Sequence, residues 1–471
     1  MNSRALAWLI GLSTLTSGLA ACGDSTTTRS EGNPSTPGDG DGDGDSGDGD
    51  SGDGDSGDGD SGDGDSGDGD TGDGDGDGGT GDGDGDTGNG ELPKGMPDDN
   101  DWNWVSMANT TCRDGSPAGY FYRKGTENSL LIYLNGGGAC ADKFFCNLNP
   151  TNVNYDFPIE SLIHGLPELL VGINGAENLS LRGKQKAPEE GIFKRADASN
   201  PAAKWSMIYV PYCTGDIHAG TRKDVMIEGI DGPQQFTGRL NYEKFLDSFG
   251  PTFKNSDKVL LTGSSAGGFG TLFNADYTIE WFKKRGNAKV YAISDSGVPF
   301  QDDFMAACLQ KRWRETWGLD AILPKDCADC FQADGGGIVT GYGKYLFHEK
   351  YKGRMLGGMI SSVGDEIIRA FYAPGENNCT VDPMSNTVEQ AIANGGAYSV
   401  DKFTKGLQDV LTNVVKRGTV GFYTLEGGKH MHLWRSEFYD KNTNDLTIAE
   451  WISKLLADEA NEQGHLFAPA P

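Results

Sequence analysis

Short apolar runs separated by longer mixed segments recur through the C-terminal three quarters of the chain. Each run is five to seven residues long and contains few charged residues. Runs of this kind are typical of strands that are buried on both faces of a parallel sheet. They cover residues 129–134, 205–211, 258–262, 289–293, 355–361 and 419–425.

The segments between these runs are compatible with helices. They are residues 242–249, 275–285, 304–317 and 400–415, and a further stretch with helical spacing covers 446–456. Strands that alternate with helices predict βαβ units and a doubly wound, mostly parallel sheet of the α/β class, with helices on both faces. Active sites in such sheets lie beyond the carboxyl ends of the strands.

The first 95 residues have a different composition. Residues 1–22 carry an early Arg4, then an apolar stretch, and end in Leu19-Ala20-Ala21-Cys22. This pattern predicts a lipoprotein-type signal peptide that is cleaved before a lipidated Cys22. Residues 23–95 consist largely of Gly, Asp, Ser and Thr, which predicts a disordered acidic tether. We therefore expect residues 96–471 to be an exported catalytic domain, anchored in the cell envelope at the outer membrane or the cell surface.

The net charge of the chain is set mainly by the tether. Twenty aspartates lie in residues 38–90, and without them the formal charge of −29 falls to −9. A moderately acidic domain argues against nucleic acid as a partner, because nucleic-acid binding depends on neutralising phosphates with Lys and Arg. Outside residues 1–22, no apolar stretch is long enough to cross a membrane.

Eight cysteines remain once Cys22 is assigned to the lipid. An even number in an exported protein predicts up to four disulfides, although the sequence does not determine their pairing. Cys327 and Cys330 have no second cysteine pair or histidine close by, so they predict a disulfide rather than a zinc site. We expect neither a metal nor an organic cofactor.

The strongest chemical signal is the sequence Gly263-Ser264-Ser265-Ala266-Gly267. This G-x-S-x-G motif directly follows the run 258–262 and precedes a segment of small residues. A strand, a tight turn and a helix in this order form a nucleophile elbow, which exposes the serine hydroxyl at a helix N-terminus. The motif predicts Ser265 as a nucleophile and makes the predicted fold α/β-hydrolase-like.

A serine nucleophile needs a general base, and in G-x-S-x-G hydrolases this histidine comes last in the chain. His430 and His432 both follow the run 419–425. We prefer His430 because Gly427 and Gly428 precede it and suit a loop that carries an imidazole over the sheet edge. His432 is the alternative base.

The carboxylate that orients the base has two candidates. Asp365 follows the run 355–361 and lies between the serine and the histidines in sequence, as expected for the acid of a triad. Asp295 also follows a predicted strand, and we interpret it as a carboxylate that braces the surrounding loops. Asp365 is the preferred acid.

An oxyanion hole needs backbone N–H groups that point at the developing alkoxide. One is expected from Ala266, directly after the nucleophile. The others are expected from Gly136 and Gly137 in the loop Asn135-Gly136-Gly137-Gly138, which follows the run 129–134. A glycine-rich loop after an early strand is where esterases carry the rest of the oxyanion hole.

These motifs resemble the pectin acetylesterase/Notum family of serine carboxylesterases, discontinuously over residues 100–440. The stretches that carry the resemblance are Tyr133 to Cys140, Val210 to Asp216, Thr262 to Gly268, Asp295-Ser296-Gly297, and the positions of Asp365 and His430. Asn135 and Ala139 replace the Glu and Trp of the family's glycine loop.

The resemblance implies a serine esterase that removes acetyl groups from pectin-like polysaccharide. The departures at Asn135 and Ala139 leave the triad intact but concern a loop that borders the acyl group. One alternative is therefore an esterase for lipid or small-molecule esters. Another is a catalytically inert carbohydrate-binding protein at the cell surface.

Overall fold

The computed structural model describes residues 100–147, 149–154, 189–380, 398–416, 418–458 and 465–466. All of them belong to one compact unit, Gly85–Pro471. The predictions for the signal peptide, Cys22 and the acidic tether lie outside the described residues, so the boundaries at residues 22 and 95 stay predictions.

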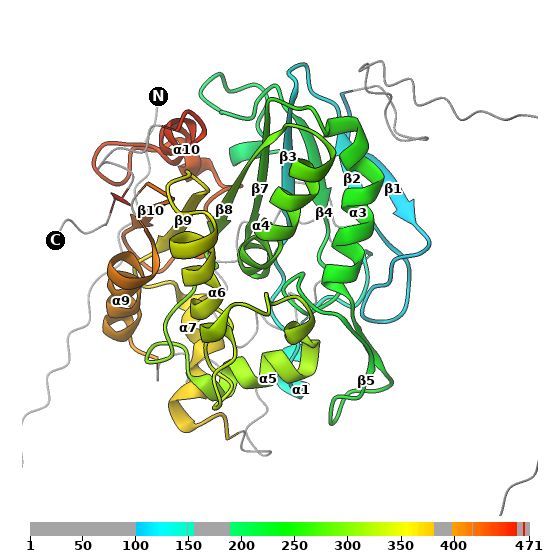
Figure 1. The fold of residues 1–471 in the computed structure, drawn as a ribbon, viewed down its shortest axis with the longest axis vertical. Helices are drawn as coiled ribbons and strands as arrows, with labels where there is room; N and C mark the ends of the chain where they lie inside the picture. Colours follow the sequence, from blue (N-terminus) through cyan, green and yellow to red (C-terminus); the bar gives the residue numbers. More distant parts are fainter. Residues whose placement is uncertain are drawn as a thin grey trace, which may run out of the picture. The chain divides into compact units, whose positions relative to one another are not determined.

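One nine-stranded sheet forms the centre of this unit (Figure 1). Seven of its strands, β4, β3, β7, β8, β9, β10 and β11, are parallel to one another, whereas β2 pairs antiparallel with both β1 and β4. In spatial order they are β1 (Asn103–Met107), β2 (Ala118–Arg123), β4 (Ser206–Val210), β3 (Ser129–Leu134), β7 (Lys258–Ser264), β8 (Lys289–Asp295), β9 (Gly357–Ser362), β10 (Val420–Leu425) and β11 (His465–Leu466).

All six predicted runs are strands of this sheet, which confirms the predicted fold class. The sequence pattern did not predict β1, β2 or β11. A separate hairpin of β5 (Arg222–Val225) and β6 (Gln234–Phe236) was also missed, because three of the four residues of β5 are charged and exposed and give no apolar run.

The predicted helices are present, with shifted ends. The α-helices are α1 (Lys143–Asn147), α3 (Gly238–Phe253), α4 (Ala266–Arg285), α5 (Ala307–Trp317), α6 (Thr340–Lys344), α7 (Glu366–Tyr372), α9 (Val400–Asp409) and α10 (Ile448–Leu456). The predicted segment 400–415 is α9 followed by a π-helical turn, Val410–Val414. A second π-helical turn, Tyr345–Lys350, contains His348.

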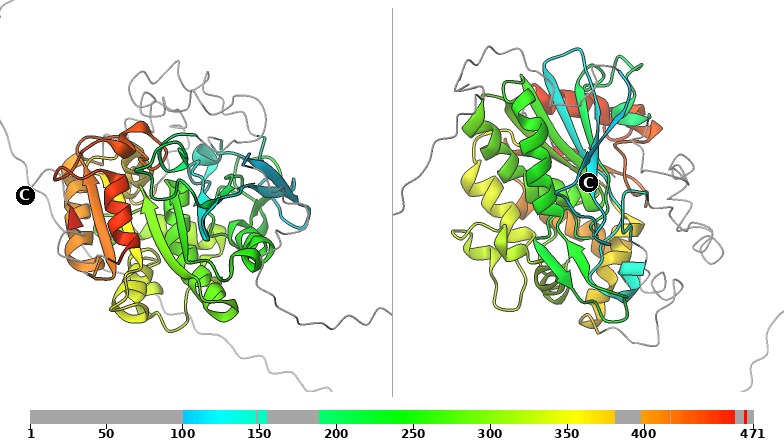
Figure 2. Two further views of the ribbon diagram at one scale, coloured as in Figure 1. Left: turned by 90° about the horizontal axis from the view of Figure 1, so that it is seen from above. Right: turned by 90° about the vertical axis from the view of Figure 1, so that its right-hand side faces the viewer.

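Two hydrophobic clusters cover the two faces of the sheet. Successive side chains of a strand point to opposite faces, and β3 shows the alternation. Leu130 and Ile132 belong to the cluster that includes α3 and α4, whereas Leu131 and Tyr133 belong to the cluster that includes α10. Figure 2 shows the sheet between these helices. Burial on both faces explains why the strands read as continuous apolar runs rather than as alternating ones.

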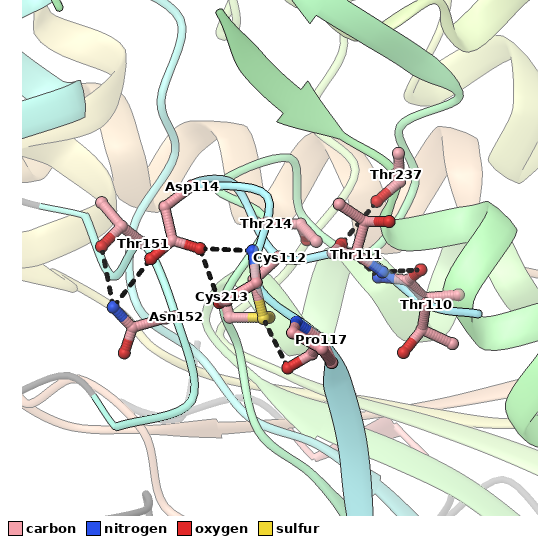
Figure 3. Close-up of a disulfide and its surroundings, with 12 residues drawn as sticks. Thr110, Thr111, Cys112, Asp114, Pro117, Thr151, Asn152, Cys213, Thr214 and Thr237 are labelled. Atoms are coloured by element: carbon pink, nitrogen blue, oxygen red, sulfur yellow. Dashed lines mark hydrogen bonds between the residues drawn. A yellow bond between two sulfur atoms is a disulfide. The ribbon is translucent and has the colours of Figure 1, made fainter. Parts of the chain in front are cut away.

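Four disulfides join the eight cysteines, which confirms the expected number. They are Cys112–Cys213, Cys140–Cys146, Cys308–Cys379 and Cys327–Cys330. The first connects the loop before β2 to the loop after β4 (Figure 3), where the Arg113 N–H also donates to the Cys213 carbonyl at 2.8 Å. Within the described ranges, no helix combines the length and the apolar character that a membrane span requires.

The disulfides differ greatly in the length of chain that they close, so we expect unequal effects on stability. Cys112 and Cys213 are 101 residues apart, whereas Cys327 and Cys330 are three residues apart. By loop entropy, replacing the first pair with alanine should lower the free energy of unfolding by about 4.7 kcal/mol, and replacing the second by about 2 kcal/mol. Urea denaturation of both double variants measures this. Equal losses would contradict the loop-entropy account.

Candidate active site

The carboxyl ends of five adjacent parallel strands lie at one edge of the sheet. The register pairs Leu134 of β3 with Gly263 of β7, and Ser264 of β7 with Asp295 of β8. It also pairs Ser362 of β9 with Leu425 of β10. The loops that carry the predicted glycine-rich segment, serine, carboxylates and histidines therefore all emerge along the same edge.

Ser265 occupies a sharp turn between β7 and α4. Its backbone has φ 59° and ψ −122°, a conformation that few non-glycine residues adopt, and it is the N-cap residue of α4. The Ser265 N–H donates to the Asp295 carbonyl at 2.8 Å, which holds the turn in place. The turn requires glycine at position 267, because a Cβ there would lie 1.9 Å from the Leu134 carbonyl oxygen. This is the geometry of a nucleophile elbow.

His430 and Asp365 form a buried pair. The His430 Nδ1 lies 2.8 Å from Oδ2 and 3.0 Å from Oδ1 of Asp365. Asp365 is fully buried and His430 is 4% exposed. Because a carboxylate only accepts hydrogen bonds, the imidazole donates from Nδ1, which leaves Nε2 as its acceptor. An imidazole held in this way can take a proton from a hydroxyl.

The backbone places this pair accurately. Asp365 is the N-cap residue of α7, and its Oδ1 accepts the N–H groups of Ile367 and Ile368 at 3.1 and 3.0 Å. The loop after β10 continues alongside the loop after β9, because the Glu366 N–H donates to the Gly428 carbonyl at 3.0 Å. These contacts fix the carboxylate and bring the histidine loop beside it.

His432 has different surroundings. Its side chain is 1% exposed, and its Nε2 lies 3.1 Å from the Ser362 Oγ. Its Nδ1 is buried with no hydrogen-bond partner, and burial lowers its pKa. The structure therefore brings His430, and not His432, into hydrogen-bond contact with the predicted acid.

Asp295 connects the serine turn to the histidine loop. Its Oδ2 accepts the Ser264 hydroxyl at 2.6 Å and the backbone N–H groups of His432 and Leu433 at 2.7 and 3.0 Å. Its backbone carbonyl accepts the N–H of Ser265. One fully buried carboxylate thus holds two loops that are far apart in sequence.

The glycine-rich loop after β3 lies against the serine turn. A Cβ on Gly136 would lie 2.8 Å from the Ser265 Cβ and 2.7 Å from the Ser264 carbonyl oxygen, so only glycine allows this approach. Gly137 lies against the Tyr212 ring, because a Cβ on Gly137 would lie 2.6 Å from the Tyr212 Cδ1. Ala266 is the first residue of α4, where helix N–H groups have no partner within the helix.

Several polar residues of this edge make contacts that the sequence did not predict. The Tyr133 hydroxyl donates to the Ser264 Oγ at 2.7 Å, which extends the hydrogen-bond chain from Asp295 to a third strand. Ser296 Oγ accepts the Met431 N–H at 3.1 Å. These serines and the tyrosine lie within apolar strands or loop motifs, where only their spatial neighbours distinguish them. Across the described segments, no group of three or more His, Cys, Asp or Glu side chains is arranged to hold a metal ion.

Known proteins share both the fold and parts of the sequence. The Drosophila Wnt deacylase Notum, in a crystal structure, superposes with a TM-score of 0.51 over 76% of this chain and 94% of that chain, at 20% identity. The zebrafish palmitoleoyl-protein carboxylesterase notum1a is 26% identical over 264 residues, which are 52% of this chain and 47% of the relative. The Arabidopsis pectin acetylesterase 4 is 27% identical over 191 residues, or 40% of each chain.

The alignments with these two curated relatives cover less than half of the relatives' length. The match to a family description is more extensive. The pectinacetylesterase family model matches residues 177–463, which is more than half of the chain and includes the serine turn, both carboxylates and both histidines. The resemblance predicted from the motifs is thereby confirmed. This chain belongs to the pectinacetylesterase family.

Proposed function

We propose that the protein is a serine carboxylesterase that removes acetyl groups from a pectin-like polysaccharide. The single observation that carries the proposal is the buried His430–Asp365 pair at the sheet edge that also presents Ser265 in a strained turn. Family membership supports the same reaction class. The names of the curated relatives, a pectin acetylesterase and palmitoleoyl-protein carboxylesterases, are those of ester hydrolases.

In the proposed reaction, the Ser265 Oγ attacks the ester carbonyl while His430 Nε2 takes the hydroxyl proton. Asp365 stabilises the resulting imidazolium. Backbone N–H groups of Ala266, Gly136 and Gly137 stabilise the oxyanion. His430 then gives the proton to the leaving alcohol, which leaves an acetyl ester on Ser265. Water, deprotonated by His430, hydrolyses this ester to acetate and restores the serine.

An aromatic side chain lies beside the glycine-rich loop. The partly exposed Phe371 borders this loop, because a Cβ on Gly138 would lie 3.1 Å from the Phe371 Cζ. The Phe371 ring stacks on Phe145, with centroids 4.6 Å apart, which fixes its position. We propose that this ring contacts the acyl group of the ester, and the family name indicates acetyl as that group. The competing substrate class is a long-chain acyl ester, which the Notum relatives' names suggest.

Acetate release distinguishes these substrates. We expect the protein to release acetate from acetylated pectin faster than from acetylated xylan, and to hydrolyse p-nitrophenyl acetate with a higher kcat/KM than the octanoate. The Ser265→Ala variant supplies the blank for each substrate. A strong preference for octanoate would overturn the acetylesterase assignment in favour of a lipid-type ester. Binding of pectin without any hydrolysis would instead indicate an inert carbohydrate-binding protein.

The cellular location is a further part of the proposal. Four disulfides are typical of exported proteins. We propose that lipidation of Cys22 anchors the enzyme in the cell envelope, with the acidic segment 23–95 as a tether toward a polymer outside the cell. Mass spectrometry of the mature N-terminus tests this, since a Cys22→Ala variant should lack the lipid and leave the membrane fraction.

A further inference from the structure

Three carbonyl groups of the glycine-rich loop are each bound by a different side chain. His218 Nε2 lies 2.8 Å from the Asn135 carbonyl oxygen. Asn149 Nδ2 donates to the Gly137 carbonyl at 2.8 Å, and the Tyr212 hydroxyl donates to the Gly138 carbonyl at 3.0 Å. All three side chains are at least 95% buried. Side chains from outside the loop therefore hold it in place through its carbonyl groups.

The His218 contact bears most directly on the oxyanion hole. In a trans peptide, the carbonyl of one residue and the N–H of the next point in opposite directions. A hydrogen bond that draws the Asn135 carbonyl toward His218 therefore turns the Gly136 N–H away from His218. Gly136 is the loop residue that lies against the Ser265 Cβ. The orientation of this one peptide plane sets where the Gly136 N–H points.

The His218 ring is itself held on several sides. It lies against Tyr212, with ring centroids 4.8 Å apart. It also packs against α4, because a Cβ on Gly270 would come within 3.0 Å of the His218 Cβ and 3.2 Å of its Cδ2. Burial lowers the pKa of His218 to about 4, so the ring is neutral near pH 7. Since a carbonyl only accepts, the single ring proton is on Nε2.

The backbone around His218 is strained and strongly constrained. Ile217 and His218 have φ values of 53° and 56°, in the left-handed region that a β-branched residue such as isoleucine rarely enters. The Asn274 side chain donates to the His218 carbonyl at 2.9 Å, and the Ile217 N–H donates to the Tyr212 hydroxyl at 2.7 Å. Such conformations persist only where the surroundings over-determine them, and they cluster at functional sites.

We propose that His218 is a positioning residue for ester hydrolysis, which sets the Asn135–Gly136 peptide so that the Gly136 N–H faces the oxyanion. This inference rests on the proposed function and adds a residue outside the predicted triad and oxyanion hole. His218 touches neither substrate nor reacting atoms in this role. It acts through one hydrogen bond from Nε2, so its contribution depends on a donor at that position rather than on its basicity.

The matched variants His218→Gln and His218→Leu separate the donor from the volume of the side chain. The glutamine amide nitrogen reaches about as far as Nε2 and can donate, whereas leucine cannot. We expect His218→Leu to lower kcat/KM for p-nitrophenyl acetate by about 10²-fold, comparable with the loss of an oxyanion donor. We expect His218→Gln to recover most of this loss. If the leucine variant does not fold, His218→Asn replaces it, because asparagine tolerates the left-handed backbone but its amide is too short.

Inhibitor binding gives a readout that a purely structural role would not move. A trifluoromethyl ketone forms a tetrahedral adduct whose oxygen needs the oxyanion donors, whereas the non-fluorinated ketone binds without the adduct. In His218→Leu, the inhibition constant of the fluorinated ketone should rise by the same factor as kcat/KM falls, with that of the plain ketone unchanged. His348→Leu is the matched control. His348 Nε2 also bonds a backbone carbonyl, that of Val414 at 2.7 Å, but in a π-helical turn outside the loops of the site. It should leave kcat/KM unchanged.

The outcomes separate the two proposals. An active wild type with equal activities in His218→Leu and His218→Gln overturns the role of His218 and leaves the proposed function standing. Equal weakening of both ketones overturns it as well, because it indicates general damage to the site. A wild type that neither hydrolyses the ester nor binds the fluorinated ketone more tightly than the plain one overturns the proposed function, and this inference with it.

Discussion

Replacing Ser265 with alanine should lower kcat for ester hydrolysis by roughly 10⁶-fold, the scale seen when a triad serine is removed. The proposed reaction has no other nucleophile at the sheet edge, and the alanine side chain has no hydroxyl for His430 to deprotonate. The substitution keeps the Cβ and removes only Oγ. Initial rates with p-nitrophenyl acetate measure the loss, and a fluorophosphonate probe should label the wild type at Ser265 and leave the variant unlabelled.

The adjacent Ser264 provides a matched control for this prediction. Its hydroxyl is buried and lies in the chain from Tyr133 to Asp295, with contacts of 2.7 and 2.6 Å. Ser264→Ala should therefore weaken the bracing of the loops and cost about 1–3 kcal/mol of stability for the unsatisfied buried partners, with activity reduced far less than in Ser265→Ala. Labelling at Ser264, or activity of Ser265→Ala within tenfold of the wild type, would contradict the assignment of the nucleophile.

The strands that position the site were predictable because their burial leaves a direct trace in the sequence. The strands of the predicted runs are covered by a hydrophobic cluster on each face, so successive residues are apolar although they point to opposite faces. The strands β1 and β2 were not predicted, and only β1 lacks this trace. β1 is the edge strand and is mostly half-buried. β2 is apolar and buried over residues 118–122, and it pairs antiparallel with β4, which is distant in sequence.

The geometry of the candidate site was predictable where it depends on local motifs. Ser265 could be singled out because the elbow requires small residues at fixed positions around it. The preference for His430 over His432 depended only on the preceding Gly427 and Gly428, since two residues in one loop differ mainly in what each faces after folding. His218 gave no motif of its own. Its relevance arises from a hydrogen bond to Asn135, 83 residues earlier, which no spacing along the chain encodes.

The contacts of Asp295 distinguish it from Asp365, which the sequence alone could not do clearly. A carboxylate at the end of a strand between the serine and the histidines satisfied the sequence criteria for a triad acid nearly as well as Asp365 did. In the structure its oxygens accept from Ser264, Ser296, His432 and Leu433. A carboxylate that is already bound by backbone and serine donors braces two loops, while Asp365 lies within hydrogen-bond distance of the His430 ring.

The second large effect is expected at the general base. Replacing His430 should lower kcat by orders of magnitude more than replacing His432 in the same loop. His430→Ala should lower kcat by roughly 10⁶-fold, as for a triad histidine that acts as a unit with its serine. His432→Ala removes a buried ring whose Nε2 contacts Ser362 at 3.1 Å. We expect it to lower stability by creating a cavity, with a much smaller loss of kcat once the variant is folded.

A double variant tests whether His430 and Asp365 act together, as their contact of 2.8 Å implies. Asp365→Asn alone should lower kcat by roughly 10⁴-fold, because the amide no longer selects the tautomer with Nε2 free to accept. When Asp365→Asn is combined with His430→Ala, kcat should fall almost no further than in His430→Ala alone. The acid acts only through the imidazole, so the two losses of kcat are far from additive. If His432→Ala proved the more damaging variant, or if the losses at His430 and Asp365 multiplied, the base would have to be reassigned and the path of the proton from Ser265 redrawn.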